Sequence, residues 1–166
     1  MTPAELLTDA FERIVEDGRG VVAGLDEARL TWRPGPDANH IAWLVWHLTR
    51  IEDDHLADVA GLEQVWTARG FHDRFGLPFE PDDTGYGHTS DQVAQVRADA
   101  GLLAEYLTAV HEQTTGYLAG VTAEDLDRVV DTRWDPPVTL GVRLVSVVND
   151  GAQHVGQASY VRGLLE

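Results

Sequence analysis

The chain has 166 residues, 43% of them hydrophobic and 24% charged, a size and composition that fit one domain with its own core. Its 28 acidic and 12 basic residues give a formal charge of -16, so we expect neither nucleic acid nor anionic membrane as a partner. The absence of cysteine excludes disulfides, thiolate-ligated metal and a cysteine nucleophile, and leaves His, Asp and Glu as metal ligands. The acidic N-terminal segment lacks the features of a signal peptide, and no apolar run is long enough for a membrane helix, so we expect a cytoplasmic protein.

Four long amphipathic segments follow one another along the chain. The first begins at a capping box formed by Thr2 and Glu5, and its apolar spacing stops at Gly18 and Gly20. The next three are expected at about Asn39 to Ala60, from the cap Ser90 to about Leu118, and from near Leu140 to the C-terminus. The sequence therefore predicts an all-α fold, a four-helix bundle, in a single domain that spans residues 1–166.

Two connections are longer than a minimal bundle needs. Residues 61–89 are rich in glycine, proline, arginine and aromatic residues, and they form a long loop between helices two and three. A loop of this length in a compact domain is usually functional or disordered, and its aromatic residues argue against disorder. Residues 127–140 contain β-branched residues and two adjacent prolines, and we expect a short extended pair there, before the fourth helix.

Three polar residues fall on inward faces of the predicted helices. His47 lies in the apolar stripe of the second helix, and Asp150 and His154 are four residues apart, so they share one face of the fourth helix. An ionised Asp on that face is costly unless it is paired or bound to a metal, and no Lys or Arg lies one turn away. The residues alone allow two interpretations: a divalent ion held by all three, or an ordinary core histidine beside a surface Asp–His pair.

Other polar residues have an ordinary interpretation beside a functional one. Gln157 follows His154 by three residues and could hydrogen-bond a ligand or pack between helices. Arg69 and Arg74 in the long loop could bind the carboxylate of a substrate or a thiol, or lie in solvent. His40 could support His47 or simply begin the second helix. The remaining histidines have no partner at ligand spacing: His55, His72, His88 and His111.

The aromatic and acidic residues near His47 are also assigned ordinary roles. Trp43 and Trp46 flank His47 in sequence, and we expect them in the core or at a dimer interface. The acidic run Glu52, Asp53 and Asp54 is most simply a solvated helix face.

Two blocks of sequence resemble a known family. NHIAWLVWHLTRIEDDHL (residues 39–56) and NDGAQHVGQASYVRGLL (residues 149–165) resemble the DinB-like superfamily, closest to its actinobacterial branch with mycothiol-dependent maleylpyruvate isomerase and related thiol S-transferases. The order of segments matches too, so the resemblance covers nearly the whole chain and implies a DinB-like bundle. It also implies a divalent metal bound by His47, Asp150 and His154. Many relatives have His at position 150 and the isomerase branch has Glu, so the shorter Asp leaves the preferred metal open.

The resemblance further implies a reaction. Three protein ligands leave open coordination positions, where family members place a low-molecular-weight thiol such as mycothiol as the nucleophile. We therefore expect a metal-dependent thiol S-transferase or isomerase that acts on a small electrophile, with zinc as the first choice of metal and nickel, manganese or iron as others. The alternatives are a metal-dependent hydrolase and a non-catalytic metal-binding, stress-associated protein. Relatives often form homodimers, so a homodimer is expected as well.

Overall fold

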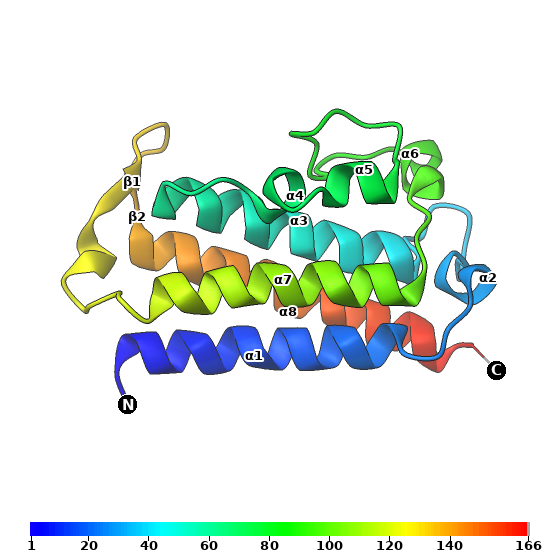
Figure 1. Ribbon diagram of the computed structural model, residues 1–166, viewed down its shortest axis with the longest axis horizontal. Coiled ribbons are helices and arrows are strands. Elements are labelled where there is room, and N and C mark those ends of the chain that lie inside the picture. Colours follow the sequence, from blue (N-terminus) through cyan, green and yellow to red (C-terminus); the bar gives the residue numbers. More distant parts are fainter. Residues whose placement is uncertain (166) are drawn as a thin grey trace.

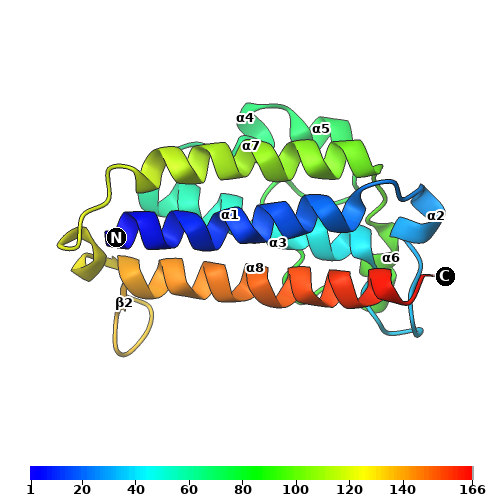
Figure 2. The same ribbon diagram turned by 90° about the horizontal axis from the view of Figure 1, so that it is seen from below.

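The computed structural model describes residues 1–165. Four long helices lie side by side as a bundle (Figure 1, Figure 2): α1 (Pro3–Val22), α3 (Ile41–Ala60), α7 (Ala100–Leu118) and α8 (Leu140–Gly163). The shorter elements are α2 (Glu27–Leu30), α4 (Val65–Ala68), α5 (Phe71–Phe75), α6 (Ser90–Gln95), the 3-10 turn η1 (Asp125–Asp127), β1 (Val129–Asp131) and β2 (Val138–Thr139). The predicted helical bundle is confirmed. No helix among residues 1–165 is both long and apolar enough to span a bilayer.

Helix α1 begins as the sequence predicts and ends later. The Thr2 side chain accepts from the backbone N–H of Glu5, and the Glu5 carboxylate accepts from the backbone N–H of Thr2. The helix then continues past Gly18 to Val22, so Gly18 is not a stop signal. A Cβ at Gly18 would lie 2.7 Å from Leu107 Cδ2 on α7, so glycine allows α1 and α7 to pack closely at this point.

The predicted third helix is divided in two, which corrects the expectation of one continuous helix from Ser90 to Leu118. Helix α6 starts after the cap Thr89, and residues 96–99 leave the helical conformation before α7 begins. Asp99 caps α7, because its side chain accepts from the backbone N–H of Leu102 at 2.8 Å. A capping side chain at this position favours a new helix start over continuation.

The expected extended pair before the last helix is present as the antiparallel strands β1 and β2, with Val129 opposite Thr139. Thr139 then caps α8. The long connection is ordered as well, since it forms α4 and α5. Trp66, Phe71 and Phe75 from this connection are buried in the core, whereas Tyr86 is 90% exposed.

Helix α3 is buried almost all around, with fifteen of its 20 residues inside the protein. It packs against α7 and α8, and residues 61–89 (the connecting segment) cover the side that these helices leave open (Figure 1). The prediction that Glu52, Asp53 and Asp54 form a solvated face is therefore wrong for the first two, which are buried. A run of acids resembles a surface in sequence, but the connecting segment and α7 cover it here.

The buried charges on α3 fasten the connecting segment to the bundle. Arg50 and Asp53 form an ion pair at 3.7 Å with both side chains fully buried. Asp53 also accepts from the Tyr106 hydroxyl at 2.8 Å and from two backbone N–H groups at the start of α4. Arg50 donates to the backbone carbonyls of Pro81 and Asp83. A charge pair this buried is tolerated because all of these groups are hydrogen-bonded.

Replacing one member of this network should destabilise the fold strongly. Asp53→Ala removes the partner of Arg50 and three acceptor contacts, so the free energy of unfolding should fall by about 3–5 kcal/mol. Urea unfolding measures the loss. Asp9→Ala is the matched control, because Asp9 pairs with Arg13 at the exposed surface of α1 and its loss should leave the unfolding free energy close to that of the parent. Equal effects of the two changes would contradict the structural role of the buried pair.

Glu52 gives the fold a pH dependence. It accepts from the Thr114 hydroxyl at 2.7 Å, and burial raises the pKa of its carboxyl from 4.5 to about 7. Because the folded state prefers the protonated form, the unfolding free energy should fall as pH rises from about 4.5 to about 7, by about 3 kcal/mol at most. Glu52→Gln should remove this decline, measured by urea unfolding at about pH 5 and about pH 8. Glu16 is exposed, so Glu16→Gln should show the same fall in unfolding free energy with pH as the parent. If Glu52→Gln also showed this fall, another group would be responsible for it.

Candidate metal centre

Three polar side chains meet between α3 and α8. His47 comes from the second turn of α3, and Asp150 and His154 project from α8, which runs antiparallel to α3 (Figure 1). One ligand atom of each residue lies within 4.8 Å of the others. His47 is buried, whereas the side chains of His154 and Asp150 are 19% and 32% exposed. The group is therefore closed on the α3 side and open on the α8 side.

The hydrogen bonds of the three residues suit a cation between them. His47 Nδ1 donates to the backbone carbonyl of Thr84 at 2.6 Å, which leaves the lone pair of Nε2 free. Five buried side-chain nitrogen or oxygen atoms in residues 1–165 lack a hydrogen-bond partner, and two of them are Asp150 Oδ2 and His154 Nδ1. Such atoms are costly unless something binds them. Two imidazoles and one carboxylate form a donor set that zinc and related divalent ions accept.

The electrostatics of His47 support the same interpretation. Burial lowers the pKa of His47, and the neighbouring His154 lowers it further. The imidazole is therefore neutral near neutral pH, which is the form that binds a metal. Asp150 supplies the single negative charge of the donor set.

Residues 83–88 of the connecting segment lie against the back of His47. Trp43 stacks on the His47 ring with centroids 4.5 Å apart, and its indole N–H donates to His88 Nδ1 at 3.2 Å. His88 Nε2 in turn donates to Asp83 at 3.0 Å. Gly85 also packs closely on the imidazole, because a Cβ there would be 3.0 Å from His47 Nδ1. This arrangement fixes the ring plane of His47 and shields its back from water.

Sequence reasoning did not find these supporting residues. The acceptor from Thr84 is a backbone carbonyl, which has no side-chain signature, and Asp83 and His88 lie in an irregular segment without periodic spacing. His40 is the cap of α3: its Nδ1 accepts from the backbone N–H of Trp43, and its Nε2 donates to the Val93 carbonyl. Burial lowers the pKa of His40 to about 4, so it is a neutral structural residue at the helix start.

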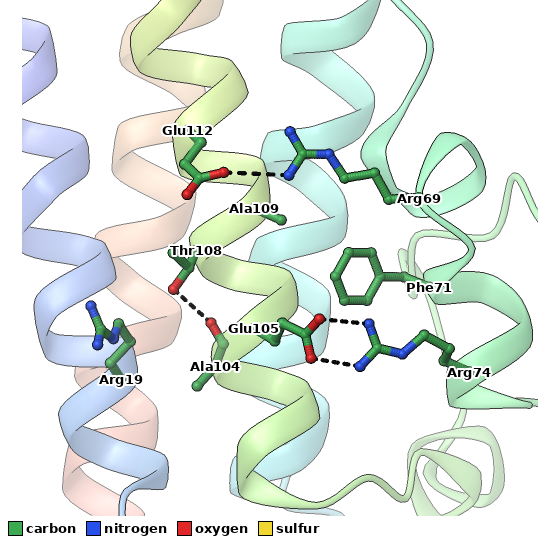
Figure 3. Close-up of a pocket in the computed structure, with 9 residues that line it drawn as sticks. All are labelled: Arg19, Arg69, Phe71, Arg74, Ala104, Glu105, Thr108, Ala109 and Glu112. Atoms are coloured by element: carbon green, nitrogen blue, oxygen red, sulfur yellow. Dashed lines mark hydrogen bonds and ion pairs between the residues drawn. The ribbon is translucent and has the colours of Figure 1, made fainter.

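The structure does not bring Arg69 and Arg74 to this group. They lie on the other side of the bundle core, where Arg74 makes two hydrogen bonds to Glu105 and Arg69 makes one to Glu112 on α7 (Figure 3). With Arg19 they line a surface pocket of about 400 Å³ that includes none of the three candidate ligands. Gln157 does lie close by, one turn beyond His154 on α8.

The other histidines have partners elsewhere. His55 accepts from Arg143 at 2.7 Å, His72 lies 3.3 Å from Asp73, and His111 pairs with Glu12 at 3.0 Å. Trp43 and Trp46 are buried in the core, which confirms the core alternative for both residues.

Comparison with known proteins finds a matching family and similar solved structures. Residues 6–166 match the model of a family described as mycothiol-S-transferase. The chain is also similar to a protein of Enterococcus faecalis whose crystal structure is described only as that of a conserved protein, with 33% identity and a TM-score of 0.91. That similarity covers 99% of this chain and 98% of the other. No functionally curated protein matches.

A side chain at Gly85 should disturb the support of His47. Gly85→Ala forces Cβ to within 2.8 Å of Trp46 Cζ3 and adds strain at a φ of +86°, so the unfolding free energy should fall by about 2–4 kcal/mol. Gly87→Ala is the matched control, because its φ is +75° but nothing lies within 4 Å of the new Cβ. It should cost only about 1 kcal/mol. Chemical denaturation of both variants measures the difference, and equal losses would mean that close contact with His47 and Trp46 is unimportant.

Proposed function

Because the chain belongs to the mycothiol-S-transferase family, we propose that it joins the thiol of mycothiol, or of a similar low-molecular-weight thiol, to a small electrophile. The reaction would take place at a divalent ion, zinc by preference, held by His47, Asp150 and His154. The observation that carries the metal part of this proposal is the meeting of three ligand atoms within 4.8 Å, two of them from side chains with unpartnered buried atoms.

Each residue of the site has a distinct task in this proposal. A divalent ion bound here supplies Lewis acidity, which lowers the pKa of a coordinated thiol. His47 is held neutral and oriented by the Thr84 carbonyl, and Trp43 keeps water from its back. Asp150 and His154 border the open side, where both reactants can approach. Since the chain has no cysteine, the reacting sulfur must come from outside the protein.

The bond changes define the reaction class. A bond forms between sulfur and an electrophilic carbon of the substrate, the leaving group departs with its electron pair, and the thiol proton passes to solvent. In the isomerase version, the thiol adds to an unsaturated carbon and leaves again, so that the thiol is regenerated. The hydrolase alternative replaces the thiol by water at the same site. A non-catalytic metal-binding role would use the same three ligands without turnover.

Metal content tests the site directly. The purified protein should hold about one divalent ion per chain by elemental mass spectrometry, and His47→Ala, Asp150→Ala and His154→Ala should each reduce it below about a tenth. His111→Ala is the control, because it removes a histidine that pairs with Glu12 on another face and should leave the metal content unchanged. A folded parent that neither carries nor takes up a divalent ion would sink the metal proposal.

Thiol binding tests the reaction. Mycothiol should bind the metal-loaded protein at least about tenfold more tightly than S-methyl mycothiol in calorimetric titration, because methylation removes the ionisable proton. The three ligand variants should lose this difference, while His111→Ala should keep it. Turnover of an ester or amide substrate that is indifferent to added thiol would favour the hydrolase instead.

A further inference from the structure

Two cavities flank the candidate ligands along the groove between α3 and α8. The first, called the polar cavity, has a volume of about 560 Å³ and includes Ile51 of α3 and Ser146 of α8 in its lining. Ile51 follows His47 by four residues and Ser146 precedes Asp150 by four, so each is one helical turn from a candidate ligand. None of the three candidate ligands lines the polar cavity itself, which begins one helical turn from His47 and from Asp150.

The second, called the apolar cavity, has a volume of about 410 Å³ and lies on the opposite side of the ligands. Leu44 lies one turn before His47 on α3, and Gln157 lies one turn after His154 on α8; both line this cavity. Because α3 and α8 are antiparallel (Figure 1), the two cavities extend from the ligands in opposite directions. Both volumes fall in the range of small-molecule sites.

The linings of the two cavities differ in chemistry. The polar cavity is bordered by ionisable or hydroxyl side chains and by two exposed aromatic rings, Trp134 and Tyr86. Its polar members are Asp54, His55, Thr84, Asp131, Arg133, Arg143 and Ser146. The apolar cavity has no Asp, Glu, His, Lys or Arg in its lining, and its polar side chains are two amides and the Tyr160 hydroxyl.

We propose that each cavity binds one of the two substrates of the transferase: the polar cavity binds the thiol and the apolar cavity binds the electrophile. This inference rests on the proposed function. Mycothiol carries its thiol on an N-acetylcysteine, which is amide-linked to glucosamine joined to inositol, so hydroxyl groups form much of its surface. These groups match the donors, acceptors and aromatic faces of the polar cavity. The electrophile occupies the apolar cavity and is an uncharged molecule with an aromatic or aliphatic body.

The preference for an uncharged electrophile follows from desolvation. An ionic group in the apolar cavity would lose water and gain no charged partner, which is costly. The overall charge of -16 repels anions in particular. Tyr160 is 69% exposed and provides an aromatic wall for an apolar group without a role in the core.

Unreactive probes test this division without metal chemistry or turnover. Saturation-transfer NMR on the purified full chain compares uncharged 1,3-dinitrobenzene, anionic 3-nitrobenzoate, and the thiol-free glucosaminyl-inositol. The dinitrobenzene should bind at least about tenfold more tightly than the nitrobenzoate. Tyr160→Ser should weaken dinitrobenzene about tenfold and leave glucosaminyl-inositol unchanged, whereas Trp134→Ala should do the reverse.

The kinetic counterpart uses reactive relatives of the same probes. With 1-chloro-2,4-dinitrobenzene, the carbon–sulfur bond forms, chloride leaves with its electron pair, and the thiol proton goes to solvent. Tyr160→Ser should raise KM for this substrate about tenfold and KM for mycothiol less than about twofold. Val145→Ser is the control variant, because Val145 is 61% exposed on α8 and lines neither cavity.

Three outcomes would overturn the division: dinitrobenzene and nitrobenzoate binding alike, both cavity variants affecting the same probe, or no probe binding the parent. Dissociation of an oligomer by Tyr160→Ser in sedimentation would assign this face to a subunit interface instead. The thiol-free probes need neither metal nor sulfur. The assignment of one substrate to each cavity can therefore be wrong while metal and thiol binding are found, and it can be right while they are not.

Discussion

Helix α3 is covered over most of its surface, and each buried polar side chain on it must therefore find its partner inside the protein. The connecting segment supplies most of these partners. Arg50 and Asp53 bind its backbone groups, and His47 donates to its Thr84 carbonyl. Breaking one of these bonds leaves a charge or an amide unpaired in the core, which costs free energy. This cost holds the irregular connecting segment in one conformation. The bonds that allow α3 to be buried are thus the ones that orient His47.

The same burial decides which side of the candidate metal centre is open. His47 faces the core and is surrounded by Trp43 and by Gly85, which has no side chain that could displace the ring. Asp150 and His154 come from α8, an outer helix whose opposite face is solvent-exposed. The rigid ligand therefore comes from the buried helix, and the two ligands at the open side come from a helix that borders the groove. This asymmetry would hold the candidate ligands in place and still leave one side open to a substrate.

The sequence predicted the bundle because helix caps and apolar spacing are local signals, as at Thr2 and along α8. It also predicted that Asp150 and His154 share a face, since that depends only on helical geometry. It could not show from local signals that α3 meets α8, and the link to His47 rested on a family resemblance. The support by Thr84 and the burial of Asp53 were missed because both depend on where an irregular segment packs. Periodicity describes one element at a time, whereas these contacts join elements distant in sequence.

The position of the candidate ligands between two cavities bears on the choice between transfer and hydrolysis. Hydrolysis combines one organic substrate with water, so one cavity beside the activated water would be enough. Transfer of a thiol combines two organic molecules, and each must be held so that sulfur and carbon meet in the right orientation. The polar cavity and the apolar cavity extend in opposite directions from His47 and His154, so their occupants would approach each other at the open side of the ligands. The absence of cysteine suits such a reaction, because the protein has no thiol of its own that could react with an electrophile held there.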